Sequence, residues 1–297
     1  MLEASLTPGL SARDALALGT AVLQPHDPAD AGTDARRLLL HALGWTALDL
    51  VKSPDRALAN NDTAIYRQLL DRRRAGEPVS RITGRRGFYG REFIVSSATL
   101  DPRPESETLI DTALDLMSAT YPSGAGLDIL DIGTGTGCLL LTLLAEWPAA
   151  RGTGIDPSAK ALTIAATNAA NLGVSDRCTW VQGYDFVGLL QRFPLIISNP
   201  PYIPSNDIAA LAREVRDHDP ILALDGGPDG LNVYRSIASG LDAHATPGWV
   251  LLEAGDGQSA AIAAIVAAAL PAARHGACKV VADMAGKPRC VAIEIRG

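Results

Sequence analysis

The chain has 297 residues, of which 47% are hydrophobic and 20% charged, so it can bury a sizeable core and is expected to divide into two domains. Its formal net charge of −7 weighs against a nucleic-acid substrate, because an acidic protein is not attracted to a polyanionic backbone. No apolar run approaches the roughly 20 residues of a membrane span, and no secretion signal is expected, so a cytoplasmic protein is predicted. The four cysteines are scattered, which argues against a metal site.

The first predicted domain, residues 1–84, is a small helical bundle. Apolar residues recur there at helical spacing, and no alternating apolar and polar stretch is long enough to indicate a strand. Ser11 is expected to cap a first helix, Thr33 or Asp34 a second, and Asp62 a third, because short polar side chains satisfy the free N–H groups at a helix start.

An arginine-rich segment spans residues 67–91. It contains eight arginines against two acidic residues, a local excess of six positive charges. Two interpretations stay open: a solvated face near a domain junction, or a docking surface for an acidic partner.

Residues 85–103 are predicted to link the domains, since aromatic and apolar residues on both sides of Gly90 are typical of a short β-hairpin. Over residues 104–297, strands and helices then alternate, which predicts a mostly parallel sheet covered on both faces. The strand candidates are residues 127–132, 152–156, 179–182, 195–198, 249–253, 279–282 and 291–295, and the main helix candidates are residues 138–147, 159–172, 231–243 and 258–270.

A glycine-rich loop follows the first of these strands and opens a helix, where an α/β fold places its ligands. It reads Asp131-Ile132-Gly133-Thr134-Gly135-Thr136-Gly137. The Gly-x-Gly-x-Gly spacing differs from the loop that suits a pyrophosphate and favours a ligand without one. A plain tight turn between strand and helix is the alternative.

Asp156 ends the next strand candidate. A carboxylate at this position can accept hydrogen bonds from the ribose hydroxyls of an adenosine. It can also cap the helix that begins near Pro157, and the two roles are compatible. The loop and the acid together indicate an adenosine-bearing cofactor without separating a nicotinamide from S-adenosylmethionine.

The tetrapeptide Asn199-Pro200-Pro201-Tyr202 follows the fourth strand candidate, residues 195–198, and is the feature that separates these two cofactors. An amide nitrogen is a poor nucleophile, so it must be held in line with the methyl carbon. The Asn199 side-chain carbonyl and the Pro200 backbone carbonyl can each accept one hydrogen of a substrate NH2 group, while the prolines stiffen the turn and Tyr202 lies against the flat substrate. Such alignment can supply about 7 to 11 kcal/mol of the barrier without a strong base. A rigid turn with no chemical role is the alternative.

With these motifs, the chain resembles the PrmC/HemK family of glutamine methyltransferases, which modify the Gly-Gly-Gln motif of class I peptide chain release factors. The likeness covers nearly the whole chain and is weakest over the first 75 residues. It includes five further segments, residues 87–93, 102–107, 214–220, 223–231 and 283–289.

The resemblance implies a helical N-terminal domain that recognises the release factor, a linking hairpin, and a class I S-adenosylmethionine-dependent methyltransferase domain. Its Rossmann-like sheet would have seven strands, the last antiparallel. Residues 133–137 would bind the cofactor, Asp156 the ribose, and Asn199 and Pro200 the substrate glutamine, with Asn199 also bordering the cofactor.

Some positions are left open by the resemblance. The family carries an acid followed by an aromatic residue at the adenine, whereas this chain reads Gly183-Tyr184-Asp185-Phe186, so either Tyr184 or Asp185 would contact the base. Glu105, Glu107 and His218 are expected either near the cleft or as braces of loops.

Four rival functions are weighed against this interpretation. An adenine methyltransferase acting on nucleic acid would need a basic cleft, and a ribosomal-protein glutamine methyltransferase would share the chemistry. A non-catalytic S-adenosylmethionine sensor would not need the amide clamp. A nicotinamide-dependent reductase would need a phosphate loop that is missing.

Overall fold

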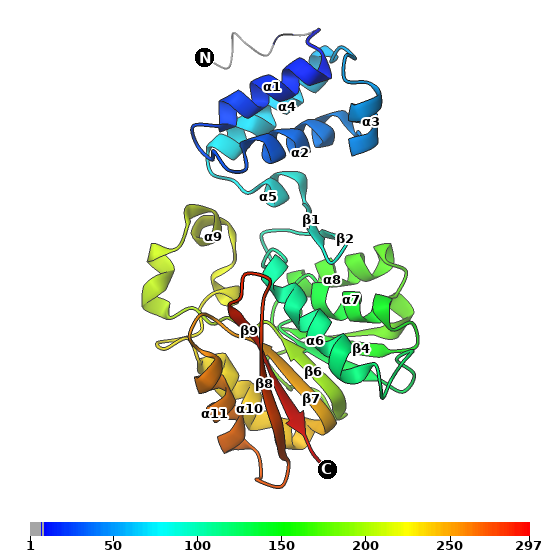
Figure 1. The fold of residues 1–297 in the computed structure, drawn as a ribbon, viewed down its shortest axis with the longest axis vertical. Helices are drawn as coiled ribbons and strands as arrows, with labels where there is room; N and C mark the ends of the chain where they lie inside the picture. The colour runs from blue at the N-terminus through cyan, green and yellow to red at the C-terminus, as the bar shows by residue number, and fades with distance from the viewer. Residues whose placement is uncertain (1–6, 8) are drawn as a thin grey trace. The chain divides into compact units, whose positions relative to one another are not determined.

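The computed structural model describes residue 7 and residues 9–297, and it divides the chain into two compact units, Met1–Gly84 and Arg85–Gly297 (Figure 1). Within the described part of the chain, no helix is both long and apolar enough to cross a membrane.

The described part of the first unit contains five helices around an apolar core. Tyr66 and Leu70 from one helix meet Leu38 and Leu39 from another in this core, and all four side chains are fully buried. Amphipathic helices of this kind are stabilised mainly by such packing. The helices are α1 (Ala12–Leu23), α2 (Ala31–Leu43), α3 (Ala47–Lys52), α4 (Asn60–Arg74) and α5 (Val79–Thr83).

One of the predicted helix caps is confirmed and the others are wrong. Ser11 Oγ accepts a hydrogen bond from the Asp14 N–H at 3.1 Å at the start of α1. Thr33 and Asp34 lie inside α2, which begins after Asp30, and Asp62 lies in the first turn of α4. Tertiary contact explains Asp34, whose carboxylate is buried and accepts a hydrogen bond from the guanidinium of Arg73 at 2.6 Å.

The arginine-rich segment, residues 67–91, is divided between the two units and is largely neutralised within them. Five of its arginines form ion pairs, several of them with acids outside the segment. The pairs are Arg72–Glu77, Arg73–Asp34, Arg73–Asp27, Arg74–Asp71, Arg85–Glu92 and Arg91–Glu146. The excess counted along the sequence therefore overstates the charge that this segment presents to a partner.

The second unit opens with the predicted hairpin, whose strands β1 (Arg85–Phe88) and β2 (Arg91–Ile94) pair antiparallel. The two turn residues, Tyr89 and Gly90, both have positive φ, at 48° and 69°. This is the turn geometry whose twist matches that of paired strands.

A seven-stranded sheet in the order β5-β4-β3-β6-β7-β9-β8 forms the centre of the second unit. β9 pairs antiparallel with both of its neighbours, and every other pairing is parallel. The predicted fold is thereby confirmed, including the antiparallel last strand. The strands are β3 (Asp128–Ile132), β4 (Arg151–Asp156), β5 (Cys178–Gln182), β6 (Phe193–Ser198), β7 (Ala245–Glu253), β8 (His275–Ala282) and β9 (Pro288–Ile295).

Helices cover both faces of this sheet, as buried parallel strands require. Successive residues of a strand alternate between the two cores: Ile129 packs with α6 and α7, whereas Leu130 packs with α10 and α11. Figure 1 shows these two helix pairs on opposite sides of the sheet. The helices are α6 (Glu107–Met117), α7 (Cys138–Glu146), α8 (Ala159–Asn171), α9 (Arg213–His218), α10 (Asn232–His244) and α11 (Ser259–Ala269). Of these, α6 and α9 were not among the main helix candidates of the sequence.

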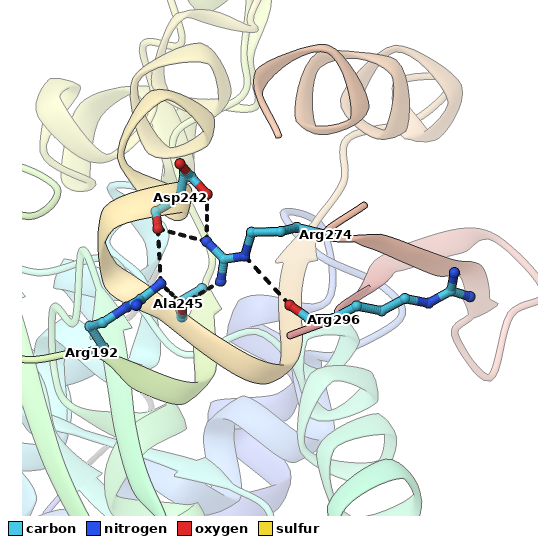
Figure 2. A network of polar contacts seen from close by, with 5 residues as sticks. All are labelled: Arg192, Asp242, Ala245, Arg274 and Arg296. Atoms are coloured by element: carbon cyan, nitrogen blue, oxygen red, sulfur yellow. Dashed lines mark hydrogen bonds and ion pairs between the residues drawn. The ribbon is translucent and has the colours of Figure 1, made fainter. Parts of the chain in front are cut away.

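Two arginines hold the junction between α10 and β7 together (Figure 2). The Arg274 guanidinium donates to the backbone oxygens of Asp242 and Ala245, both at 2.6 Å, and also pairs with the Asp242 carboxylate. Arg192 donates to the same two carbonyls. These carbonyls at the end of α10 have no partner within the helix, and cations there also complement the helix dipole.

Arg274→Ala is therefore expected to lower the free energy of unfolding by about 1 to 3 kcal/mol, because it removes charged hydrogen bonds at partly buried carbonyls. Urea denaturation followed by tryptophan fluorescence measures this, since Trp147, Trp180 and Trp249 lie in the second unit. Arg296→Ala is the matched control, because the hydrogen bonds between Arg274 and Arg296 involve only backbone atoms of Arg296. Equal losses in the two variants would contradict the assigned role.

Candidate active site

A cavity of about 330 Å³ lies in the second unit where β3, β4 and β6 end. Strand register brings the three ends together, because Ile132 pairs with Ile155 on one side and with Ser198 on the other. This is the edge of a parallel sheet at which α/β proteins bind ligands. The cavity collects most of the predicted site residues, namely Gly133, Thr134, Gly135, Thr136, Asp156, Tyr184, Asp185, Asn199, Pro200 and Pro201.

The glycines of the loop after β3 serve two purposes. Gly133, Gly135 and Gly137 all have positive φ, at 71°, 55° and 79°, a conformation that favours glycine. A Cβ built on Gly133 would meet no atom within 4 Å, and one on Gly135 would meet only a carbonyl oxygen at 3.9 Å. A Cβ on Gly137 would lie 2.9 Å from Leu141 Cδ1. The first two glycines therefore leave room for a ligand, and the third permits close packing of α7.

Buried polar groups hold this loop in place. The N–H groups of Gly133 and Thr134 both donate to the Ile155 carbonyl, at 2.8 and 3.0 Å. Thr134 Oγ1 donates to Asp131 Oδ2 at 2.6 Å, and burial raises the pKa of the Asp131 carboxyl to about 7. Asp131 itself does not line the cavity, so its role is to fix the loop.

Asp156 lies at the end of β4 and is 8% exposed. Its two carboxylate oxygens accept from Gly135 N–H at 2.9 Å and from Ser158 N–H at 2.8 Å. Burial raises its pKa, and these two hydrogen bonds oppose the shift. Ser158, not Asp156, caps α8 by accepting from Ala161 N–H. Each carboxylate oxygen keeps acceptor capacity for a hydroxyl group, so the acid is held ready for a ribose.

The segment after β6 contributes the amide of Asn199, whose Nδ2 donates to Ser106 Oγ at 3.0 Å. Ser106 in turn donates to the buried carboxylate of Glu253. Within the described part of the chain, Asn199 Oδ1 accepts no hydrogen bond. The geometry therefore leaves the side-chain carbonyl, the acceptor group of this residue, available at the cavity wall.

Tyr202 is the one residue of the tetrapeptide that does not line the cavity. It packs against the core beneath α10 and α11, and its backbone oxygen accepts from Gln258 Nε2 at 2.9 Å. Burial raises the pKa of its hydroxyl to about 12. A direct contact of its ring with a substrate stays a prediction.

Tyr184 and Asp185 both line the cavity and differ in their surroundings. The Tyr184 side chain is 61% exposed. The Asp185 carboxylate accepts a hydrogen bond from Ser236 Oγ on α10, and its backbone has a positive φ of 50°. One of the two carboxylate oxygens is therefore already used within the protein.

Other residues quoted for the family resemblance lie around the cavity. Arg103 lines it and pairs with Asp219 at 2.5 Å. Glu107 Oε1 accepts from Tyr89 N–H at 2.7 Å and braces the hairpin turn, whereas Glu105 and His218 do not line the cavity.

Ser106 and Glu253 were not predicted as site residues. Ser106 was quoted only within the family segment, and Glu253 only as the end of a strand candidate. No local pattern links two residues so distant in the chain.

The sheet order, the open glycine loop and the acid after β4 define a class I S-adenosylmethionine-dependent methyltransferase. The catalytic domain of hMettl16, in complex with the MAT2A 3′UTR hairpin 1, has a similar fold, with a TM-score of 0.51 and 14% sequence identity over 87% of this chain and 91% of that chain.

Comparison with known sequences specifies the family. Residues 14–84 match the PrmC N-terminal domain, and residues 105–219 match the methyltransferase small domain. A release factor glutamine methyltransferase of Cereibacter sphaeroides is 43% identical over 96% of this chain and 99% of its own length. One of Bradyrhizobium diazoefficiens is 44% identical over 88% and 87%. The chain belongs to the release factor glutamine methyltransferase family, and the predicted resemblance is confirmed.

No group of three or more His, Cys, Asp or Glu side chains suited to a metal occurs among residues 9–297. The cavity fits S-adenosylmethionine through the open backbone at Gly133 and Gly135 and the ordered carboxylate of Asp156.

Gly135→Ala is expected to weaken binding of S-adenosylhomocysteine at least about tenfold, since its Cβ would occupy the cavity wall that the ligand must approach. Isothermal titration calorimetry measures the affinity. Gly173→Ala is the matched control, because Gly173 also has a positive φ, at 70°, with nothing within 4 Å, and lies outside the cavity. If both variants bind equally well, Gly135 does not border the ligand.

Proposed function

We propose that this protein transfers a methyl group from S-adenosylmethionine to the side-chain amide nitrogen (N5) of the glutamine in the Gly-Gly-Gln motif of class I peptide chain release factors. The products are N5-methylglutamine and S-adenosylhomocysteine. The observation that carries the proposal is the meeting of the open glycine loop and the Asn199 amide in one cavity, in a chain that belongs to this family.

The residues that hold the cofactor follow from the cavity. Within residues 133–137, Gly133 and Gly135 offer open backbone, and Asp156 accepts the ribose hydroxyls with the capacity its own hydrogen bonds leave. Tyr184 is the better candidate for stacking on the adenine, because Ser236 already donates to the Asp185 carboxylate. When bound, S-adenosylmethionine supplies an electrophilic methyl group on a positively charged sulfur.

Asn199 and Pro200 orient the substrate. The Asn199 Oδ1 and the Pro200 carbonyl each accept one hydrogen of the glutamine NH2 group, which turns the nitrogen toward the methyl carbon. Polarising both N–H bonds in this way makes the nitrogen more nucleophilic, and orientation supplies the larger share of the rate. Pro201 stiffens the segment by its fixed φ. Tyr202 is proposed to close over the flat amide and exclude water from the substrate side.

The rival functions fit less well. A sensor without turnover has no use for an Asn199 carbonyl that is held ready by a hydrogen-bond chain. A nucleic-acid adenine methyltransferase conflicts with the net charge of −7, and the likeness to an RNA-bound structure at 14% identity concerns the fold alone.

The proposed partner is a class I release factor, which places the reaction in the cytoplasm. The Gly-Gly-Gln tripeptide offers little surface, so we assign recognition of the rest of the release factor to residues 1–84. This domain matches the PrmC N-terminal domain and forms its own core. Residues 85–103 would then link it to the methyltransferase domain, residues 104–297.

Incubating a purified release factor with this protein and S-adenosylmethionine is expected to add one methyl mass to the Gly-Gly-Gln glutamine, as measured by peptide mass spectrometry. Asn199→Ala is expected to lower the rate by about 100-fold or more, in the range seen when one oriented polar group is removed from an active site. Methylation of a ribosomal protein instead, with the release factor unchanged, would assign the rival substrate within the same chemistry.

Deleting residues 1–84 is expected to raise KM for the release factor at least about tenfold while leaving S-adenosylhomocysteine affinity within about twofold. Calorimetry of the truncated protein shows whether the remaining unit is folded and binds the cofactor product. Unchanged kinetics on the intact release factor would refute recognition by this domain.

A further inference from the structure

We propose that Ser106 and Glu253 are positioning residues that fix which way the Asn199 side-chain amide points. The inference rests on the proposed function, because it concerns the amide that holds the substrate glutamine. It adds two residues to the site: Ser106, which lines the cavity, and Glu253, which does not, and both act through the Asn199 amide.

The three residues meet where separate parts of the second unit come together. Asn199 follows β6 directly, and Glu253 ends β7, the neighbouring strand. Ser198 pairs with Leu252 in the sheet, so Asn199 and Glu253 occupy adjacent positions just beyond that pair. Ser106 comes from the 3-10 turn Pro104–Ser106 before α6 and is 1% exposed. It lies within hydrogen-bond distance of both.

The direction of the hydrogen bonds from Asn199 to Ser106 and from Ser106 to Glu253 fixes the orientation of the Asn199 amide. An ionised carboxylate only accepts, so Ser106 must donate its single proton to Glu253. The Ser106 oxygen then has only lone pairs to offer, which match Asn199 Nδ2 and repel Oδ1. The amide is thereby held with Nδ2 on Ser106 and with Oδ1 available to the substrate. With the amide reversed, an NH2 group would face the substrate NH2, and both would be donors.

The burial of Glu253 supports a role beyond packing. Its side chain is 2% exposed, and within the described residues it forms no ion pair within 4 Å. A buried carboxylate without an ionic partner is costly, whereas an apolar residue at the end of a central strand would not be. The Ser106 hydroxyl is the group that satisfies it directly.

Protonation of Glu253 would remove the selection, because a protonated carboxyl can itself donate to Ser106. Ser106 could then donate to Asn199 Oδ1 and permit the reversed amide. Burial raises the pKa of Glu253 to about 7, so the carboxyl is expected to change protonation state near that pH. Several groups face this carboxyl: Arg103 and Glu105 near the 3-10 turn, Arg289 and Cys290 on β9, Cys138 on α7, Tyr202 after β6 and Tyr234 on α10.

The activity is expected to rise with pH through the Glu253 pKa. Below the Glu253 pKa the carboxyl is protonated and the amide orientation is lost, so kcat falls. Above it the carboxylate is ionised and kcat reaches its plateau. The substrate amide does not titrate in this range, so the rising limb of the plot of kcat against pH reports a group of the enzyme.

The test compares Ser106→Ala, Ser106→Thr and Glu253→Gln in the full chain, with a release factor as substrate and saturating S-adenosylmethionine. Ser106→Ala is expected to lower kcat by about 10- to 100-fold with KM within about twofold, since it removes the hydroxyl that orients the Asn199 amide. Ser106→Thr keeps the hydroxyl and is expected to restore kcat to within about threefold. Thr142→Val is the matched control: it removes another buried hydroxyl, on α7, which has no hydrogen-bond partner among the described residues and does not line the cavity, and it should leave kcat unchanged.

The Glu253→Gln variant is used to measure the pH dependence of kcat, which would not change if Glu253 had only a structural role. Its carbonyl still accepts from Ser106 but does not titrate, so the part of the rising limb that belongs to Glu253 should disappear between about pH 5.5 and 9, whereas any part that belongs to Asp131, whose pKa burial also raises to about 7, would remain. Three results would overturn the proposal: full activity of Ser106→Ala, failure of threonine to rescue, or an unchanged pH profile in Glu253→Gln. Failure of the wild-type protein to methylate the release factor would instead reject the proposed function.

Discussion

The parallel register of β3 with β4 and β6 is the constraint on which the site depends. Because Ile132 pairs with both Ile155 and Ser198, the three strands end at one level, and the segments that follow them share one cavity. Each strand alternates its side chains between two helix-covered cores. A slip of one residue would exchange the two buried faces, so packing of the whole sheet maintains the alignment of cofactor loop and substrate amide.

Buried polar groups hold the segments at the ends of these strands in fixed orientations. Asp156 joins the loop after β3 to the turn before α8 by two hydrogen bonds, and Ser106 joins Asn199 to Glu253. The carboxylates of Asp156 and Glu253 are both buried, and hydrogen bonds in a buried environment are stronger than in water. The protein thus orients two reactants with groups that do not themselves react.

Local sequence was a good guide to the second unit and a weaker one to the first. Apolar runs and the turn at Gly90 predicted the sheet and hairpin, because strands buried on both faces have an unmistakable composition. The cap predictions at Asp34 and Asp62 were wrong because a short polar side chain near a helix start is equally suited to a tertiary ion pair or to the first turn. The sequence left two interpretations of the arginine-rich segment open, because two of the acids that pair with its arginines, Asp34 and Glu146, lie outside it.

The sequence by itself determined the fold class and located the glycine loop and the tetrapeptide at residues 199–202 that the cavity brings together, because each motif is a contiguous segment whose residue types and spacing carry its physical requirement. The tertiary structure alone decided which groups orient that tetrapeptide. Ser106 lies 93 residues from Asn199 and 147 from Glu253 along the chain. Hydrogen bonds over such separations leave no periodicity in a sequence, since they depend on the packing of a whole sheet and not on neighbouring residues.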